Sequence, residues 1–321
     1  MNLVKKCPIC NSEELSERKK YIFSRPKNKS KYTGIAKLFT EIIRNKENQL
    51  FYLCLCENCG FLFLNPRFTE EDYKLLFHSE DVLPPIEKTL GTTHQRALST
   101  YQFLQQFYDC NLKNNPKLLD YGGAWGYMLN PFLKKFDCYC IDYFKYELPE
   151  SIQYLGRDFN DLKIKYNFDI ILALHVLEHV NYPRKLLTNL TSFLSENGII
   201  YAQVPLGCFK EWNSLSTPLR HINFFSEQSL YNYFRIAGLD VIYLNTTYTQ
   251  FGDLPGHWNI DIVGKRRRKN YIQKEINYLS TKLQHTLRFY YYMLYIIRNK
   301  KYQPRIFKER LKTLIKNINK K

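Results

Sequence analysis

Near its middle the chain reads Lys117-Leu118-Leu119-Asp120-Tyr121-Gly122-Gly123-Ala124-Trp125-Gly126, a short apolar run followed directly by a glycine-rich turn. The next residues, Tyr127–Phe136, have the apolar content expected of a helix. A strand, a glycine-rich turn and a helix in this order are typical of an open parallel sheet, where the turn lets the backbone approach a ligand closely. The sequence therefore predicts an α/β fold with a ligand site at the carboxyl end of this strand.

A second apolar run, Cys138–Ile141, is followed by Asp142, which lies 20 residues after Gly122. An acidic residue at this distance from such a turn is placed to bind the hydroxyl groups of a ribose. The alternative is an ordinary loop acid that follows a strand.

These motifs resemble class I S-adenosylmethionine-dependent methyltransferases, in the branch that contains sugar and small-molecule enzymes. The family's first motif, Asp-x-Gly-x-Gly-x-Gly, is matched by Asp120, Gly122 and Gly126, with Ala124 in place of the middle Gly. The resemblance spans residues 92–263. It continues through Phe168–Val180, Pro183–Leu194 and Gly198–Pro205, and it implies a Rossmann-like seven-strand sheet completed near Val241–Asn245 and Trp258–Val263.

The resemblance also implies how the chain holds S-adenosylmethionine. The glycine-rich turn would line the methionine part, Asp142 would bind the ribose diol, Asp158-Phe159 would lie beside the adenine, and Leu174-His175 would close the floor. The cofactor-binding residues expected in this way are Asp120, Gly122, Gly123, Gly126, Asp142, Asp158, Phe159 and Leu174.

Three polar residues follow the predicted fourth strand, His175, Glu178 and His179, at the spacing of one face of a helical turn. They resemble the Glu-x-x-Glu-His segments of ubiquinone-pathway O-methyltransferases and small-RNA 2′-O-methyltransferases, where a divalent ion holds a substrate diol, and His221 would add a ligand. Three hypotheses stay open: a hydrogen-bonded structural pair, a metal site formed by Glu178, His179 and His221, and a metal-free general base at His179 or His221. The candidate catalytic residues are His179, His221 and His175.

Two C-x-x-C knuckles occur in the first part of the chain, at Cys7-Pro8-Ile9-Cys10 and Cys56-Glu57-Asn58-Cys59. This spacing lets two thiolates of one tight turn reach the same tetrahedral ion. We therefore expect a structural zinc held by Cys7, Cys10, Cys56 and Cys59, with unligated buried thiols as the alternative. Cys54 is the less favoured ligand, and Gly60 suits a turn with positive φ.

The charge is concentrated at the carboxyl-terminal end. The chain has a net charge of +17, and residues 264–321 hold 18 of its 47 Lys+Arg and 2 of its 30 Asp+Glu. The aromatic and cationic side chains of this basic tail suit an anionic membrane surface or single-stranded nucleic acid, and a solvated helical pair packed on the body or on a second copy is the plain alternative.

Composition excludes several classes of protein. Hydrophobic residues make up 45% and aromatic residues 16%, more than a disordered chain carries. The longest apolar run, Phe289–Ile297, has 9 residues, whereas a membrane-spanning helix needs about 20. The beginning of the chain has no apolar segment of signal-peptide length, so we expect a cytoplasmic protein, peripheral to the membrane if the tail binds there.

We expect four parts: a zinc-ribbon-like module with an insertion (1–66), a helical linker or lid (67–116), the methyltransferase domain (117–263) and the basic helical tail (264–321). The order of zinc ribbon and methyltransferase resembles that of deoxysugar C-methyltransferases and glycan-cluster methyltransferases, but this chain lacks the length for the former's extra C-terminal domain. Phe209, Trp212 and Pro218 would form a pocket wall or an ordinary loop.

The leading functional hypothesis is O-methylation of a sugar hydroxyl in surface-polysaccharide biosynthesis. The alternatives are an RNA 2′-O-methyltransferase that grips phosphates with its tail, a deoxysugar C-methyltransferase, and a catalytically inactive binding or scaffold protein.

Overall fold

The computed structural model describes residues 1–25, 38–72, 86–109, 113–143, 145–162, 164–207, 221–249 and 257–267. The chain divides into two units, Met1–Lys274 and Glu275–Lys321, and every described residue belongs to the first. The pocket-wall residues Phe209, Trp212 and Pro218 and the basic tail beyond residue 267 lie outside the described residues.

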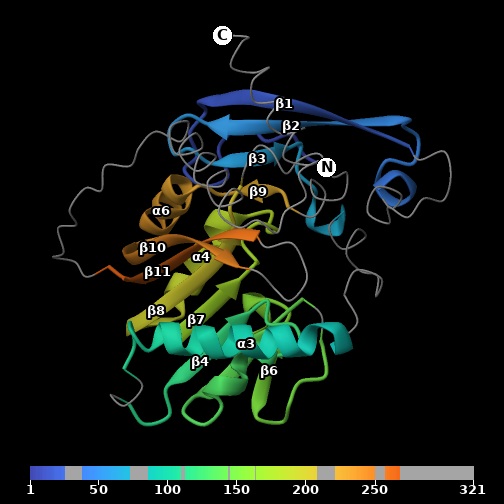
Figure 1. The fold of residues 1–321 in the computed structure, drawn as a ribbon. Helices are drawn as coiled ribbons and strands as arrows, with labels where there is room; N and C mark the ends of the chain where they lie inside the picture. The colour runs from blue at the N-terminus through green and yellow to red at the C-terminus, as the bar shows by residue number, and fades with distance from the viewer. Residues whose placement is uncertain are drawn as a thin grey trace, which may run out of the picture. The chain divides into compact units, whose positions relative to one another are not determined.

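A seven-stranded mixed sheet forms the larger layer (Figure 1). Its strand order is β10-β11-β8-β7-β4-β5-β6, in which β6, β5, β4, β7 and β8 run parallel and β11 runs antiparallel to both of its neighbours. This arrangement confirms the predicted α/β fold with a Rossmann-like seven-strand sheet. The strands are β4 (Lys117–Tyr121), β5 (Asp137–Ile141), β6 (Ile152–Gly156), β7 (Phe168–Leu174), β8 (Leu194–Pro205), β10 (Leu239–Thr249) and β11 (His257–Arg266).

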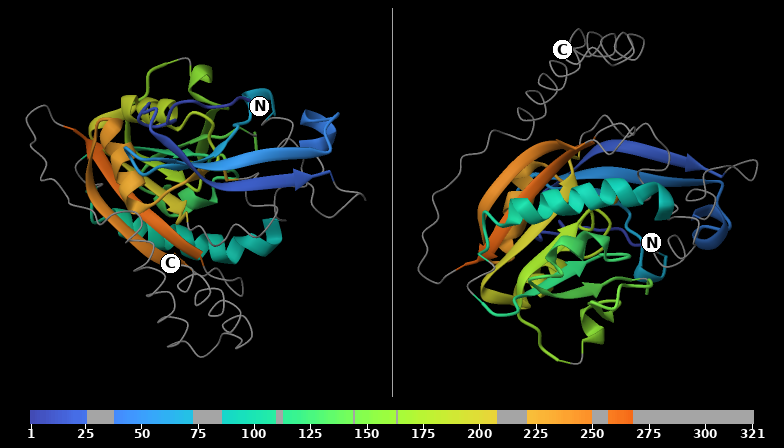
Figure 2. Two further views of the ribbon diagram at one scale, coloured as in Figure 1. Left: turned by 90° about the horizontal axis from the view of Figure 1, so that it is seen from above. Right: turned by 60° about the horizontal axis from the view of Figure 1, so that its bottom comes forward.

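Alternating side chains of the central strands belong to two different cores. Leu118 of β4 packs in the core that contains α3 (Ile86–Leu104) and the 3-10 helix η3 (Tyr127–Phe132). Leu119 packs in the opposite core, with α4 (Pro183–Ser192) and α6 (Glu227–Ile236). Successive strand residues point to opposite faces, so a strand covered on both faces is mostly apolar, as β7 is apart from Asp169. Figure 2 shows α3 lying along one of these faces.

The order of the strands creates a switch point between β4 and β7. The chain passes from β4 outward to β5 and β6, and then returns to place β7 on the other side of β4. Ligands bind at the carboxyl ends of the strands at such a point. The glycine-rich turn after β4 and the residues after β7 therefore begin at neighbouring positions of the sheet.

The N-terminal segment forms a second, antiparallel sheet in the order β1-β2-β3-β9 (Figure 1). Its strands are β1 (Leu15–Ser24), β2 (Asn48–Cys56), β3 (Leu62–Asn65) and β9 (Asn223–Phe224). The fourth strand comes from the far part of the chain, since Leu62 pairs with Phe224 and Phe63 with Asn223. The predicted N-terminal module is thus completed by two residues from the segment 117–263, which the sequence predicts to be a separate domain.

The helical segments agree only in part with those that the sequence predicts. The expected helix over Tyr127–Phe136 is the six-residue 3-10 helix η3, which contains Pro131, a residue that cannot donate a backbone hydrogen bond in a longer helix. Helix α3, Ile86–Leu104, lies within the segment 67–116 that the sequence predicts as a helical linker or lid. Within the predicted N-terminal module, Leu38–Ile42 forms a single π-turn, η1.

Strand β11 extends into the residues that the sequence assigns to the tail. It ends at Arg266, and Arg266 Nη2 donates a hydrogen bond to the Thr191 carbonyl over 2.7 Å. Arg267 Nε lies 3.3 Å from the Asp240 carboxylate. These first basic residues therefore belong to the folded sheet. Among the described residues, no helix is long and apolar enough to cross a membrane.

Candidate functional site

The glycine-rich turn after β4 has left-handed backbone at three positions: Gly122 with φ 78°, Ala124 with φ 46° and Gly126 with φ 73°. A Cβ atom at Gly122 would lie 2.5 Å from Val176 Cγ2, and one at Gly123 would lie 2.8 Å from the Asp120 carboxylate. Residues with a side chain rarely adopt positive φ, so Gly is favoured at 122 and 126. The turn thus closes tightly against β4 and against the loop that follows β7.

Asp142 lies directly opposite this turn, at the end of β5. Its Oδ2 accepts a hydrogen bond from the Ala124 N–H over 2.9 Å, and the Gly122 N–H bonds to the Ile141 carbonyl over 2.7 Å. Tyr154 of β6 donates to the Asp142 carbonyl over 3.0 Å. The carboxylate is therefore held beside the turn, at the sheet edge where the sequence predicts a ribose.

Asp120 is a buried acid beneath the turn. Its side chain is 2% exposed, and its Oδ2 has no hydrogen-bond partner among the described residues. Burial, together with the nearby Asp142 carboxylate, raises the pKa of Asp120 to about 7, although Arg96 acts in the opposite direction. Burial also lowers the pKa of the Arg96 guanidinium. An unsatisfied acidic oxygen at this depth is the kind of group that a polar ligand of the turn would satisfy.

Asp158 and Phe159 follow β6. The exposed Asp158 caps the short helix η4 (Phe159–Asp161), and its Oδ1 accepts a hydrogen bond from the Asn160 N–H over 2.6 Å. The Phe159 ring stacks on two other rings, with 5.2 Å between its centroid and that of Tyr121 and 4.8 Å between its centroid and that of Phe193. Because both faces of this ring are covered, Phe159 would meet an adenine with its edge or its backbone.

His175 follows Leu174 at the end of β7 and has φ 57°. The predicted helical face is therefore absent, since this residue is not helical and the segment forms a turn with a bond from the His179 N–H to the Val176 carbonyl. His175 Nε2 lies 3.1 Å from Gln203 Oε1, and its Nδ1 lies 3.3 Å from Glu178 Oε1. Both imidazole nitrogens of His175 are thus engaged within the protein.

The structure brings Glu178, His179 and His221 together. One ligand atom from each lies within 4.8 Å of the others, and the two imidazole rings meet edge to face with centroids 4.8 Å apart. Glu178 is 2% exposed, and its Oε1 lies 3.8 Å from His179 Nε2. Burial by itself raises the pKa of Glu178, but the neighbouring His175, His179 and His221 outweigh burial and hold that pKa below its usual value. We call residues 177–180 the histidine turn.

A buried polar network that the sequence reasoning missed lies beneath His175. Gln203 Oε1 accepts a hydrogen bond from Arg96 Nη2 over 3.0 Å, and Gln203 Nε2 donates to Asp261 Oδ1 over 2.6 Å. Asp261 also accepts from Tyr201 over 2.7 Å and from the Thr247 hydroxyl. The available signal was a polar residue inside an apolar run, Gln203 between Ala202 and Val204 in β8 and Asp261 between Ile260 and Ile262 in β11.

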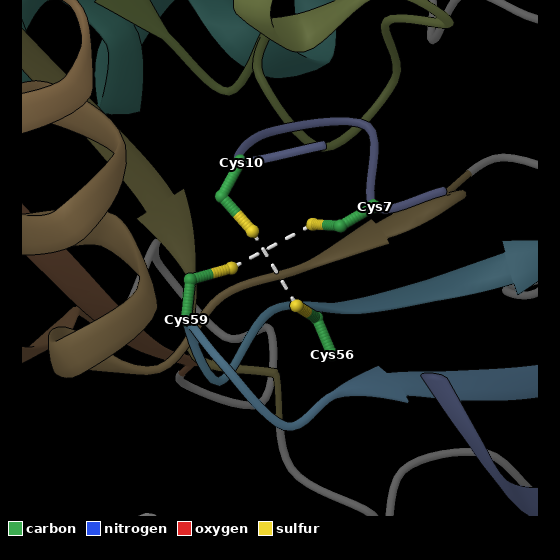
Figure 3. A group of neighbouring side chains, drawn as sticks. All are labelled: Cys7, Cys10, Cys56 and Cys59. Atoms are coloured by element: carbon green, nitrogen blue, oxygen red, sulfur yellow. Dashed lines mark hydrogen bonds between the residues drawn. The ribbon is translucent and has the colours of Figure 1, made fainter. Parts of the chain in front are cut away.

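Four cysteines converge near the N-terminus (Figure 3). Cys7 Sγ lies 3.6 Å from Cys59 Sγ, Cys10 Sγ lies 3.5 Å from Cys56 Sγ, and all four sulfurs lie within 4.8 Å of one another. The two knuckles have the same local form, because the residue after each second cysteine is left-handed, with φ 63° at Asn11 and φ 73° at Gly60. Cys54 is buried on β2 and does not belong to this group.

These sulfurs fit a tetrahedral zinc ion. With Zn–S bonds of about 2.3 Å, the edges of a tetrahedron measure about 3.8 Å, close to the two Sγ–Sγ distances of 3.6 and 3.5 Å. The hydrogen bond with Cys59 lowers the pKa of Cys7 to about 5, whereas burial raises the pKa of Cys56 to about 11. Metal binding would deprotonate the remaining thiols, and four thiolates leave no open position for catalysis.

The residues around the turn also fit S-adenosylmethionine. The left-handed glycines hold the backbone close to the sheet edge, Asp142 is fixed beside it, and Asp120 has a buried oxygen to satisfy. Gly122, Gly126 and Asp142 are thus brought together as the sequence predicts. Leu174 is the last residue of β7, and Asp158 lies two residues after β6, so both lie at carboxyl ends of strands in the same sheet.

Comparison with known proteins agrees with this fold. Residues 92–244 match a family model described as a methyltransferase domain. No curated protein matches the chain.

Solved structures with a similar fold are distant in sequence. A chain of the Haloferax volcanii complex between the Trm112 methyltransferase activator and a methyltransferase is 17% identical, with a TM-score of 0.45, and the match covers 58% of this chain and 93% of that chain. The 1,6-didemethyltoxoflavin N1-methyltransferase of Burkholderia thailandensis is 15% identical, with a TM-score of 0.39, and the match covers 58% of this chain and 92% of that chain. Magnesium protoporphyrin IX methyltransferase of Synechocystis is 13% identical, with a TM-score of 0.42, and the match covers 61% of this chain and 94% of that chain.

Proposed function

We propose that this chain is an S-adenosylmethionine-dependent methyltransferase that methylates a hydroxyl oxygen of a sugar used in surface-polysaccharide biosynthesis. The match of residues 92–244 to a methyltransferase-domain model supports the reaction type. The observation that carries the proposal is the meeting of His179, His221 and the buried Glu178 beside the end of β7. The glycine-rich turn lies against the same loop, through the contact between Gly122 and Val176. A proton acceptor and the predicted cofactor site are therefore neighbours.

An alcohol needs such a proton acceptor. Bound S-adenosylmethionine would supply an electrophilic methyl group to the acceptor oxygen, with S-adenosylhomocysteine as the leaving group. The acceptor hydroxyl loses its proton in this step, and His179 or His221 receives that proton on an imidazole nitrogen. Glu178, whose Oε1 lies 3.8 Å from His179 Nε2, stabilises the positive charge that the histidine gains, as a buried carboxylate near a catalytic histidine does.

His175 has a different role in this arrangement. Its two nitrogens face Gln203 and Glu178, so its contacts are with the floor of the site and with the Glu178 carboxylate. It is therefore not placed to take the proton of the acceptor. A general base must reach the proton that it removes. The base is therefore assigned to His179 or His221.

The charge distribution favours a small acceptor over nucleic acid. Residues 1–263, which contain the whole site, hold 29 Lys+Arg and 28 Asp+Glu, so their net charge is only +1. Phosphate contacts dominate the affinity of nucleic-acid enzymes and require a concentrated positive surface. The exposed ring of Tyr182, just after the histidine turn, offers the kind of aromatic face on which a sugar stacks.

The test is methyl transfer from radiolabelled S-adenosylmethionine to nucleotide sugars and, separately, to RNA oligonucleotides, with the product located by NMR. We expect an O-methyl sugar. His179→Gln should lower the turnover by about 100- to 10,000-fold if it is the base, while S-adenosylhomocysteine still binds. His94→Gln, which changes an exposed histidine of α3, serves as the matched control.

Three results would contradict the proposal. A C-methyl product would support the deoxysugar alternative, and RNA methylation that is lost on truncation after Arg267 would support the nucleic-acid alternative. A folded protein that binds no S-adenosylhomocysteine would support a non-catalytic scaffold. The truncation is placed after Arg267 because an earlier end would remove residues of β11.

A further inference from the structure

Arg67 connects the N-terminal sheet to the histidine turn. It lies two residues beyond β3 and is 4% exposed. Its Nη2 donates to the Val180 carbonyl and to Asn223 Oδ1, each over 2.9 Å. Its backbone is held as well, because Arg67 and Asn2 exchange hydrogen bonds of 2.7 and 2.8 Å. A buried guanidinium with this fixed backbone holds the end of the turn in one place.

Asn223 holds the same turn from the other side. It is 1% exposed, and its Nδ2 donates to the Leu177 carbonyl over 2.8 Å and to the Val180 carbonyl over 2.7 Å. Its backbone N–H donates to the Glu178 carbonyl over 3.1 Å, and the N–H of Ile222, the residue after His221, donates to the same carbonyl over 2.9 Å. One buried side chain and two amides thus fix three carbonyls of the histidine turn and place His221 beside it.

Asn223 is also a strand residue of the cysteine-bearing sheet. Its backbone pairs with Phe63 in β3, and the Leu64 N–H donates to the Ile222 carbonyl over 2.9 Å. Strand β3 follows the second knuckle directly, where the Cys56 N–H donates to the Phe61 carbonyl over 2.9 Å. Hydrogen bonds and short stretches of the chain between them therefore connect the four-cysteine group with the turn that carries His179 and with Ile222, the residue after His221.

We propose that Arg67 and Asn223 are positioning residues, and that the four-cysteine module is a working part of the methyltransferase site because it sets the geometry of His179 and His221 through them. This inference rests on the proposed function, in which one of these histidines accepts the acceptor's proton. It predicts that damage to this link lowers turnover and leaves the cofactor site unchanged, since the hydrogen bonds described above join Arg67 and Asn223 to the histidine turn and to the N-terminal sheet.

The first test compares the imidazole signals of His179 and His221 in long-range proton–nitrogen NMR spectra of the full-length protein. The signals are assigned from the spectra of His179→Gln and His221→Gln. Arg67→Met keeps the length of the side chain and removes its donors, so we expect both signals to shift or broaden. Arg67→Lys, which restores one donor, should bring them back partly toward their wild-type positions.

The matched control is Asn232→Ala. Asn232 Nδ2 donates to the Cys59 carbonyl over 3.2 Å, so this change also removes a bond between α6 and the cysteine module, but one that does not touch the histidine turn. We expect its imidazole signals to match those of the wild type. If Asn232→Ala moves them as strongly as Arg67→Met does, the effect comes from general loosening and the proposal is wrong.

Kinetics give the second readout, measured with the acceptor that the methyl-transfer assay described under the proposed function selects. We expect Arg67→Met to lower kcat by about 10- to 100-fold, as a displaced catalytic group does, with the S-adenosylhomocysteine affinity within about twofold of the wild type. If Arg67→Met does not fold, Asn223→Asp replaces it, because it keeps the acceptor for Arg67 and loses the amide donors to the turn. Folded variants with wild-type signals and kcat would overturn the proposal.

The two proposals fail in different ways. If the wild type transfers no methyl group to any hydroxyl acceptor, the proposed function is wrong and the catalytic meaning of this link falls with it. The NMR comparison still decides whether Arg67 sets the geometry of the two imidazoles. Wild-type imidazole signals in a folded Arg67→Met variant would contradict the positioning role even where methyl transfer is observed.

Discussion

The backbone N–H of Ala124 donates a hydrogen bond to Asp142 Oδ2 over 2.9 Å, which joins the glycine-rich turn after β4 to the acid at the end of β5. Ala124 has φ 46°, and it stands where the methyltransferase motif that this turn resembles has its middle glycine. The contact explains how a residue with a side chain is kept in a left-handed conformation: the bond to Asp142 offsets part of the backbone strain.

Substitutions in this turn should show at which position a side chain is tolerated and at which it is excluded. Gly122→Ala should lower the free energy of unfolding by about 1 to 3 kcal/mol and weaken S-adenosylhomocysteine binding, because the new Cβ would lie 2.5 Å from Val176 Cγ2. Ala124→Gly should change stability by less than about 1 kcal/mol, since relief of strain and the flexibility of the unfolded chain oppose each other. Urea unfolding measures both. Equal effects of the two changes would contradict this account of the turn.

The buried Asp120 should make stability depend on pH. Its pKa is about 7 in the folded protein and near 3.8 in the unfolded chain, so the unfolded carboxyl ionises first. The stability that this group contributes is present at low pH and is lost as the pH rises through 7. Relative to Asp120→Asn, the wild type should lose about 1 to 3 kcal/mol between pH 5 and pH 8. Parallel pH profiles of the two proteins would show that Asp120 is ionised throughout.

The cysteine group should bind one zinc ion per chain and stabilise the N-terminal sheet. Cys59→Ser should abolish zinc binding, measured by atomic emission, and lower the melting temperature, because a structural zinc contributes directly to folding. Cys54→Ala is the matched control, since Cys54 is buried on the adjacent strand but lies outside the group. Retention of zinc by Cys59→Ser, or its loss in Cys54→Ala, would contradict the assigned ligands.

The network beneath His175 should be sensitive to the loss of one acceptor. Asp261 is 5% exposed and accepts hydrogen bonds from Tyr201, Gln203 and Thr247. Asp261→Ala leaves these donors buried without a partner, which should cost about 3 kcal/mol or more in the free energy of unfolding. An unfolding curve that matches the wild type would show that water satisfies these donors.

The parts of the site that lie close together in the sequence were predictable. The glycine-rich turn, Asp142 and the two cysteine knuckles are recognisable because each requires a specific residue at a fixed local spacing. The grouping of Glu178, His179 and His221 was one of three hypotheses that the sequence left open, and it arises in a turn rather than on a helical face.

The long-range parts were not predictable from local patterns. Strand β9 has two residues, too few for any periodic signal, yet it completes the N-terminal sheet. Arg67 and Asn223 are 156 positions apart, and only the pairing of β3 with β9 brings them together. Gln203 and Arg96 meet in the same way, from β8 and α3. Each of these contacts depends on tertiary packing, which cannot be predicted from the sequence of one segment alone.

The most direct test of the central claim is calorimetric titration of the full chain with S-adenosylhomocysteine. Asp142→Ala is compared with Asp137→Ala, which changes an exposed acid at the opposite end of the same strand β5. We predict micromolar binding by the wild type and by Asp137→Ala, and a loss of about 1 to 3 kcal/mol in Asp142→Ala. Equal affinities for all three folded proteins, or no binding by the wild type, would contradict the assignment of this sheet edge as the cofactor site.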